Sequence, residues 1–232
     1  MSTLTIPEID MPEGATTQEY AYERLRNAIM VGAIKPGTAL TIRNLAESLA
    51  LSLTPIREAV RRLSSENAIE VLGNRRLRVP DMTPGRFEEL VRLRVVLETY
   101  AAQRSLPYVS DRLVDSLVAL DERMDASYAA GDFDELTHLN RRFHGLLYCL
   151  NPDQAVMPLI ESVWLQLGPF QRQVVRHLGG VYVVDHHKKL VEALRARDPE
   201  AVAVAIEGDV TDGLVRSGRA LLTQDKWAVQ VA

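Results

Sequence analysis

The segment that most constrains the fold of this chain is Asn44–Leu63, with the sequence NLAESLALSLTPIREAVRRL. It is predicted to form two short helices, because Ser52 supplies N-cap chemistry in its middle and Pro55 suits the first turn of a second helix. In that second helix, apolar residues recur at the i, i+3, i+4, i+7 spacing of a face that packs on a core. These apolar residues are Ile56, Ala59, Val60 and Leu63. The opposite face carries Thr54, Arg57, Arg61 and Arg62.

A helix with one packed face and one face of hydroxyl and guanidinium groups is suited to a DNA groove. Arginine can contact phosphates and bond guanine with two hydrogen bonds, and serine and threonine hydroxyls can bond phosphate oxygens. For this segment alone, the alternative is an amphipathic helix with a solvated basic face, which is a common arrangement.

Two short strands are predicted directly after this unit, over 69–72 (IEVL) and 77–79 (LRV). A β-hairpin with a basic tip after two helices is typical of the winged form of the helix-turn-helix, and Arg75 and Arg76 at that tip would lie along the DNA backbone or in a minor groove. A further amphipathic helix is predicted over 19–31, before the unit.

The uneven distribution of charge indicates two domains. Residues 17–80 contain ten Lys and Arg against six Asp and Glu, whereas residues 81–232 contain 17 against 22. A basic module joined to an acidic remainder is typical of a nucleic-acid reader with a second domain. Because the positive excess is modest, we expect two copies to bind one DNA site. The predicted organisation is a flexible arm over 1–16, a winged helix-turn-helix DNA-binding domain over 17–80, an all-helical domain over 83–222 and a tail over 223–232.

The predicted fold class is mainly α, with the N-terminal winged helix-turn-helix followed by an antiparallel bundle of six to seven helices. The bundle helices are expected near 83–106, 110–130, 132–150, 153–177, 180–197 and 198–222. The single cysteine, Cys149, excludes an intramolecular disulfide framework, and its leucine neighbours predict a small core residue. With no apolar segment of signal or membrane-spanning length, a cytoplasmic protein is expected.

Several polar residues fall on the apolar faces of the predicted bundle helices. Asn140 and His144 lie one turn apart within one apolar stripe, while His187 and Asp209 lie on the inward faces of two later helices. Polar groups on core faces are costly unless they are bonded or coordinated, so these four residues could form a nitrogen and oxygen site for a divalent ion. The alternative for each histidine alone is a satisfied core residue.

Two further polar positions have competing interpretations. Arg94 and Glu98 stand among apolar residues of the first bundle helix, where they could line the same pocket or form an i, i+4 ion pair. His186 shares a side of its helix with Lys189 and is predicted to be solvated.

These features together resemble a known family. The stretch LRNAIMVGAIKPGTALTIRNLAESLALSLTPIREAVRRL resembles the N-terminal domain of GntR-family bacterial transcriptional regulators. The segments LRVVLETYAA, LNRRFHGLLY and HHKKLVEALRARDPEA resemble the all-helical, ligand-binding FCD domain of the FadR subfamily. The resemblance covers roughly residues 17–222. It implies a homodimer that binds a palindromic operator, and that releases or rearranges when a small molecule enters the helical domain; in many members this molecule is a carboxylate bound beside a metal ion.

The resemblance also implies roles for single residues. Those that match DNA contacts of the family are Arg43, Ser52, Thr54, Arg57 and Arg61. Those that match its metal ligands are Asn140, His144, His187 and Asp209, which would hold a divalent metal ion of the Zn, Ni or Mn class. Arg94 matches an arginine that often lies beside the effector.

The chain departs from the family pattern at a few of these positions. Leu53 stands where the family typically has an arginine, and Arg76 and Asn67 stand where glycines are usual. Asn140 is neutral where many members use aspartate, and Asp209 occupies the position of a histidine.

Three functions are compatible with this pattern. The first is a ligand-responsive transcriptional regulator, acting as a repressor, with a carboxylate effector bound beside a metal ion. The second is a constitutive DNA-binding dimer with no effector, whose metal is structural or absent. The third, a metal-dependent hydrolase, is disfavoured because the sequence has no evident general base, nucleophile elbow or phosphate loop. We therefore expect a regulator and not an enzyme.

Overall fold

The computed structural model describes residues 4–11, 13–73, 76–177 and 186–230, and the chain divides into two compact units. The N-terminal unit comprises Met1–Thr83 together with Trp164–Gln173 of a later helix. The helical unit comprises Pro84–Val163 and Val174–Ala232.

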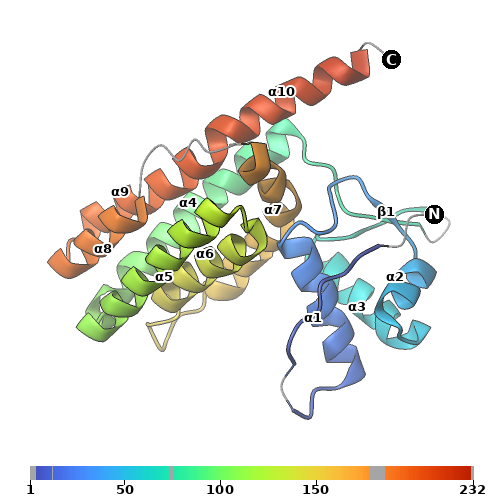
Figure 1. The fold of residues 1–232 in the computed structure, drawn as a ribbon, viewed down its shortest axis with the longest axis horizontal. Helices are drawn as coiled ribbons and strands as arrows, with labels where there is room; N and C mark the ends of the chain where they lie inside the picture. The colour runs from blue at the N-terminus through green and yellow to red at the C-terminus, as the bar shows by residue number, and fades with distance from the viewer. Residues whose placement is uncertain (1–3, 12, 74–75, 178–185, 231–232) are drawn as a thin grey trace. The chain divides into compact units, whose positions relative to one another are not determined.

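The N-terminal unit is a winged helix-turn-helix, as predicted. Its elements are α1 (Thr17–Met30), β1 (Ala39–Leu40), α2 (Ile42–Leu49), α3 (Leu53–Ser65), β2 (Glu70–Val71) and β3 (Leu77–Arg78) (Figure 1). The three strands are antiparallel in the order β1-β3-β2, and Arg78 is the register partner of both Ala39 and Glu70. The strand β1 was not predicted from the sequence, because two residues are too few to show an alternating pattern.

Local signals set the ends of these helices. Thr16 and Glu19 form a capping box at the start of α1, and the Thr41 hydroxyl accepts a hydrogen bond from the Asn44 backbone N–H at 3.1 Å at the start of α2. After α3, Asn67 adopts a left-handed conformation with φ of 58°, which asparagine tolerates better than most residues. The buried faces of the three helices then share one apolar core with Leu40 of β1 and Leu77 of β3.

Part of the segment predicted as a flexible arm is packed on this unit. Ile6 is buried in the core, and the Arg24 guanidinium donates hydrogen bonds to the backbone oxygens of Ile6 (2.9 Å) and Pro7 (3.2 Å). These contacts order the chain around Ile6 and Pro7, so the prediction of a flexible arm is wrong for this part. The proline and acidic residues of the segment gave no sign of this packing.

The helical unit contains the predicted bundle. Its α-helices are α4 (Pro84–Ser105), α5 (Asp111–Ala130), α6 (Phe133–Tyr148), α7 (Met157–His177), α8 (His186–Ala196), α9 (Pro199–Val210) and α10 (Arg216–Gln230), with a 3-10 turn, η2 (Leu106–Tyr108), and a π-helical turn, η3 (Thr211–Val215). α5 packs on α6 and α8, and α9 packs on α4 and α8, so these helices lie side by side (Figure 1). The start of the helix predicted at 180–197 falls partly outside the described residues. The helix α10 extends into the segment predicted as a tail.

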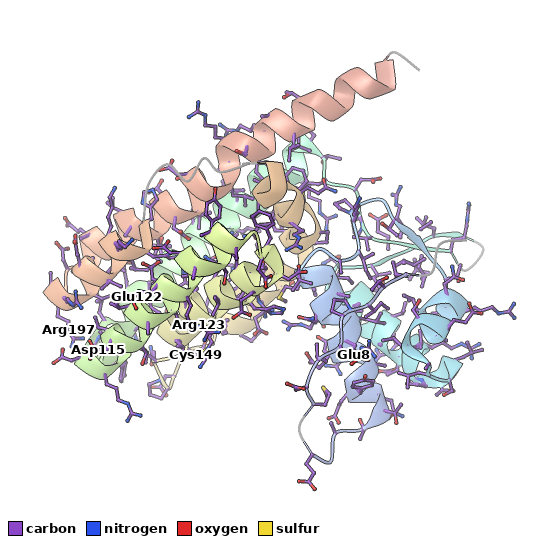
Figure 2. The ribbon with its side chains drawn as sticks, in the orientation of Figure 1. Glu8, Asp115, Glu122, Arg123, Cys149 and Arg197 are labelled. Atoms are coloured by element: carbon purple, nitrogen blue, oxygen red, sulfur yellow. The ribbon has the colours of Figure 1, made fainter. Side chains whose placement is uncertain are left out.

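Cys149 corrects one prediction. It is exposed at the C-cap of α6 and not in the core (Figure 2). The buried face of α6 carries Leu139, Phe143 and Leu147, and a residue two positions after Leu147 falls on the opposite side of the helix. Among the described residues, no helix has both the length and the apolar character needed to cross a membrane.

Candidate functional site

The helix α3 presents the predicted polar face outward. Ile56, Ala59 and Leu63 are fully buried, whereas Thr54 and Arg57 on the other side of the helix are exposed. The N-cap residue of α3 is Ser52, but its hydroxyl makes no capping hydrogen bond. The backbone N–H groups in the exposed first turn of α3 therefore remain available to donate hydrogen bonds to a phosphate.

The three arginines predicted on this face have different environments. Arg57 is exposed, and Arg61 is exposed while forming an ion pair with Glu58, with 2.6 Å between Nη2 and Oε1. Arg62 instead lies over the Tyr22 ring of α1, with its guanidinium carbon 3.5 Å from the ring centroid. Arg62 is thus a cation–π contact between α1 and α3, and its predicted place on the outward basic face was wrong.

The other predicted DNA-contacting residues flank α3. Arg43 is exposed in α2. Arg76 is exposed in the wing, where its backbone oxygen accepts a hydrogen bond from Leu72 N–H at 2.8 Å. Arg75 lies outside the described residues. Arg78, which the sequence did not single out, pairs with Glu70 across the wing at 2.8 Å.

Leu53, at the first position of α3, is 43% exposed. Its methyl groups face the solvent among hydroxyl and arginine side chains. This N-terminal end of α3 is the end that would approach the base edges of DNA. Apolar contact with the 5-methyl group of thymine is the readout open to such a side chain.

The helical unit brings the four predicted ligand residues together from three helices. His144 of α6, His187 of α8 and Asp209 of α9 each offer one ligand atom, and these atoms all lie within 4.8 Å of one another. The amide of Asn140, one turn before His144, lies beside them, with its Nδ2 3.2 Å from His187 Nε2. The oxygen and nitrogen of such an amide are interchangeable by a flip, so Asn140 can offer its oxygen at the same place.

The spacing of these atoms fits a shared ion. His144 Nε2 is 3.4 Å from His187 Nε2 and 3.2 Å from Asp209 Oδ2, and His187 Nε2 is 3.5 Å from Asp209 Oδ1. Ligands about 2.1 Å from one ion stand roughly 3.0 Å apart at right angles and roughly 3.4 Å apart at tetrahedral angles. Two imidazoles, a carboxylate and an amide oxygen also form a donor set that first-row divalent ions accept.

A set of buried polar side chains surrounds this cluster. The Tyr148 hydroxyl lies 3.0 Å from His144 Nδ1 and donates a hydrogen bond to Glu98 Oε2 at 3.0 Å, and Arg94 Nε donates to Glu98 Oε1 at 2.6 Å. Arg94 and Glu98 thus form the i, i+4 ion pair that was one of the two predicted interpretations. On the other side, His187 Nδ1 lies 3.3 Å from Asp121 Oδ1.

Sequence reasoning missed Tyr148 and Asp121, although each had a positional signal. Tyr148 follows His144 by four residues and therefore lies on the same face of α6. Asp121 follows Leu117 by four residues within the buried stripe of α5. A tyrosine on an apolar stripe is an ordinary core residue, so its hydrogen-bonding role becomes evident only when its partners are known.

The charges of the cluster shift the acidity of two groups. Burial alone would raise the pKa of the Asp209 carboxyl, but His187, His144 and Arg94 outweigh burial and hold this pKa well below its usual range. Burial, strengthened by the nearby charge of Glu98, raises the pKa of the Tyr148 hydroxyl well above its ordinary value. Asp209 is therefore a carboxylate and Tyr148 a neutral hydroxyl near pH 7.

His186 corrects another prediction. It is buried, with Nε2 2.7 Å from Asp212 Oδ2, and it is not solvated as the pattern of its helix predicted. The cause is close packing against α9, where Gly208 has no side chain and leaves room for the His186 ring.

Comparison with known proteins agrees with the fold. A family model described as bacterial regulatory proteins of the gntR family matches residues 17–79, and the FCD domain model matches residues 89–211. The chain is 30% identical over 179 residues to the HTH-type transcriptional regulator McbR of Escherichia coli (strain K12), covering 76% of this chain and 81% of the relative. It is 27% identical to the gluconate operon transcriptional repressor of Bacillus licheniformis, covering 90% of this chain and 88% of the relative.

A solved structure, E. coli McbR/YncC, matches with a TM-score of 0.80 at 26% identity, covering 91% of this chain and 99% of that chain. The winged helix-turn-helix and the helical unit therefore define a DNA-binding transcriptional regulator and not an enzyme. The chain belongs to the GntR family of bacterial regulators and carries an FCD domain, a combination that fits the FadR subfamily.

Proposed function

We propose that this regulator is a ligand-responsive repressor that binds a palindromic operator as a homodimer and responds to a carboxylate effector held beside a metal ion. The observation that carries the proposal is the coexistence of an exposed arginine face on α3 with a buried His–His–Asp cluster in the helical unit. Repression is supported by the similarity to the gluconate operon transcriptional repressor of Bacillus licheniformis. Action on chromosomal DNA would place the protein in the cytoplasm.

We assign DNA contact to the exposed residues of α2, α3 and the wing. These are Arg43, Ser52, Thr54, Arg57, Arg61 and Arg76, and the sequence adds Arg75. Arg57 is the best single test, because it is exposed midway along the polar face of α3 and its removal leaves the buried face intact.

The test of DNA reading is Arg57→Ala. The operator is first selected from random DNA with the wild-type chain. Loss of one arginine contact should then cost about 1–3 kcal/mol per half-site, enough to abolish a specific gel shift at physiological salt. Arg195→Ala, which removes an exposed arginine of α8, is the matched control and should leave the shift unchanged. Equal binding by Arg57→Ala and wild type would overturn this assignment.

We assign the metal site to His144, His187, Asp209 and Asn140. A divalent ion held there would supply a Lewis-acid positive charge that an anionic ligand could bind. Arg94 is close enough to Asp209 to help depress its pKa, which supports a place for this guanidinium beside an anionic effector. A bound carboxylate would then favour one arrangement of the DNA-binding units over another.

A homodimer is supported by an apolar stripe on α4. Leu93, Val96 and Tyr100 are 46%, 65% and 56% exposed and follow the 3, 4 spacing of a helical seam. A second copy of the same helix would cover these side chains by two-fold symmetry.

A constitutive dimer with a structural metal is a second candidate, and one observation favours it. His144 and His187 are only 1% and 4% exposed, as in closed structural sites. Titration of metal-loaded protein with dicarboxylates, sugar acids and aromatic acids separates the two functions. Heat of binding together with release of operator DNA supports the responsive regulator, and its absence across the panel supports the constitutive one.

A further inference from the structure

A continuous chain of buried polar contacts leads away from the candidate metal site. It runs from His144 through Tyr148 and Glu98 to Arg94, and the four residues are between 0% and 5% exposed. Buried polar groups of this kind are satisfied by specific partners, so the direction of each hydrogen bond is constrained.

The direction can be worked out from the end of the chain at Arg94. A guanidinium can only donate, so Glu98 accepts from Arg94 with both carboxylate oxygens, at 2.6 Å on Oε1 and 3.3 Å on Oε2. A carboxylate oxygen can only accept, so the single proton of the Tyr148 hydroxyl is donated to Glu98 Oε2. The Tyr148 oxygen then has only lone pairs left to offer His144.

The contact at 3.0 Å between Tyr148 and His144 therefore requires a proton on His144 Nδ1. In a neutral imidazole, a proton on Nδ1 leaves the lone pair on Nε2. It is Nε2 of His144 that faces His187 and Asp209 in the candidate site.

We propose that Tyr148, itself oriented by Glu98, is a positioning residue that fixes His144 as the Nδ1–H tautomer and so keeps Nε2 ready to bind a metal ion. This inference rests on the metal site of the proposed function. Outer partners of this kind commonly fix the tautomer and ring orientation of ligand histidines.

The second histidine has an outer partner of different chemistry on the opposite side. Its Nδ1 faces the Asp121 carboxylate at 3.3 Å, while its Nε2 faces Asn140, His144 and Asp209. Both rings therefore direct Nε2 inward and Nδ1 outward. The Asp121 carboxylate lies directly beside His187, whereas Glu98 reaches His144 only through the phenol of Tyr148.

The experiment compares Tyr148→Phe and Glu98→Gln with wild type in the full-length, metal-free chain. Nitrogen-15 NMR of the histidine rings reports the tautomer of His144, with His144→Gln used to assign its signals. The wild type should carry a proton on His144 Nδ1. Tyr148→Phe should lose this preference. Glu98→Gln can donate its amide to the Tyr148 oxygen, which lets the hydroxyl donate to His144 and should favour the Nε2–H form.

The second readout is the affinity for Zn²⁺, measured by competition with a chromophoric chelator. Tyr148→Phe should weaken binding about 10–100-fold, as for other outer partners of metal ligands. The control is Tyr108→Phe, which removes a hydroxyl from a tyrosine that is 46% exposed, and it should leave both readouts unchanged.

The outcomes separate this inference from the metal site itself. An Nε2–H form in the wild type, or a tautomer that neither substitution changes, would overturn the role of Tyr148. If the wild type bound no Zn²⁺, Ni²⁺ or Mn²⁺, the proposed metal site would fail. In that case the NMR comparison would still decide whether Tyr148 fixes the His144 ring.

Discussion

The Arg94–Glu98 ion pair depends on both of its members, because Glu98 is fully buried and Arg94 is 5% exposed. Removing one member of such a pair leaves the other as an uncompensated buried charge. Arg94→Met should therefore destabilise the protein by about 3–5 kcal/mol, measured by urea unfolding with the metal removed.

A surface pair in the same helix provides the control for this prediction. Arg92 and Glu89 are 3.0 Å apart, with side chains about 70% exposed. Arg92→Ala should change the free energy of unfolding by no more than about 1 kcal/mol, because water solvates both charges. A similar small effect for Arg94→Met would contradict the account of the buried pair.

Single residues differ in how far the sequence predicted their roles. The sequence predicted that three ligand residues lie together, namely His144, His187 and Asp209. A polar residue on an apolar helix face can be recognised from the spacing of residues in the sequence alone. Tyr148 was missed because its importance depends on Glu98, which is 50 residues away in the sequence. Arg62 was assigned to the wrong surface because its partner, Tyr22, lies in another helix.

Among the helices, α7 contains a close approach that only glycine permits. Gly168 precedes Pro169 inside α7, in the stretch that belongs to the N-terminal unit, and a Cβ atom at Gly168 would overlap the backbone of Met30 in α1. Gly168→Ala should therefore force the two backbones apart and destabilise the protein by about 1–3 kcal/mol, measured by thermal or urea unfolding.

The same substitution in α6 should have the opposite sign. A Cβ atom at Gly145 meets no atom within 4 Å, and an alanine in a helix interior is favoured over glycine by roughly 0.5–1 kcal/mol. Gly145→Ala should thus stabilise the protein slightly. Equal effects of the two substitutions would show that α1 and α7 are not in close contact at Gly168.

The helices were predictable as elements, but their boundaries and short neighbours were less so. The periodic patterns of α4 and α5 gave bounds within about two residues, because caps and breakers flank them. The strand β1 has two residues and the π-helical turn η3 has five, which is too short for a recognisable hydrophobic pattern in the sequence. The strand β1 depends on its pairing with β3.

For the molecule as a whole, removal of metal should reduce stability. An ion that binds only the folded chain at 100 times its dissociation constant stabilises it by about 2.7 kcal/mol. Addition of a chelator should therefore lower the Tm of the wild type, and readdition of Zn²⁺ should restore it. Neither treatment should move the Tm of His144→Ala, and an equal chelator response in that variant would place the stabilising ion elsewhere.

Self-association should depend on the exposed stripe of α4. Val96→Glu places a charge in the proposed dimer seam without touching the buried face of the helix. Analytical ultracentrifugation should find a dimer for the wild type and a monomer for Val96→Glu, with loss of tight operator binding. The control is Val204→Glu, in which an exposed valine of α9 receives the same charge. A dimer that survives Val96→Glu would place the interface on another surface.

Hydroxyl-radical footprinting on DNA selected by the wild-type chain shows whether two copies of α3 read one duplex. We predict two protected half-sites related by a dyad and about one helical turn apart, with two chains bound per duplex. A single unsymmetrical protection by one chain, or selection that enriches no DNA, would contradict this proposal.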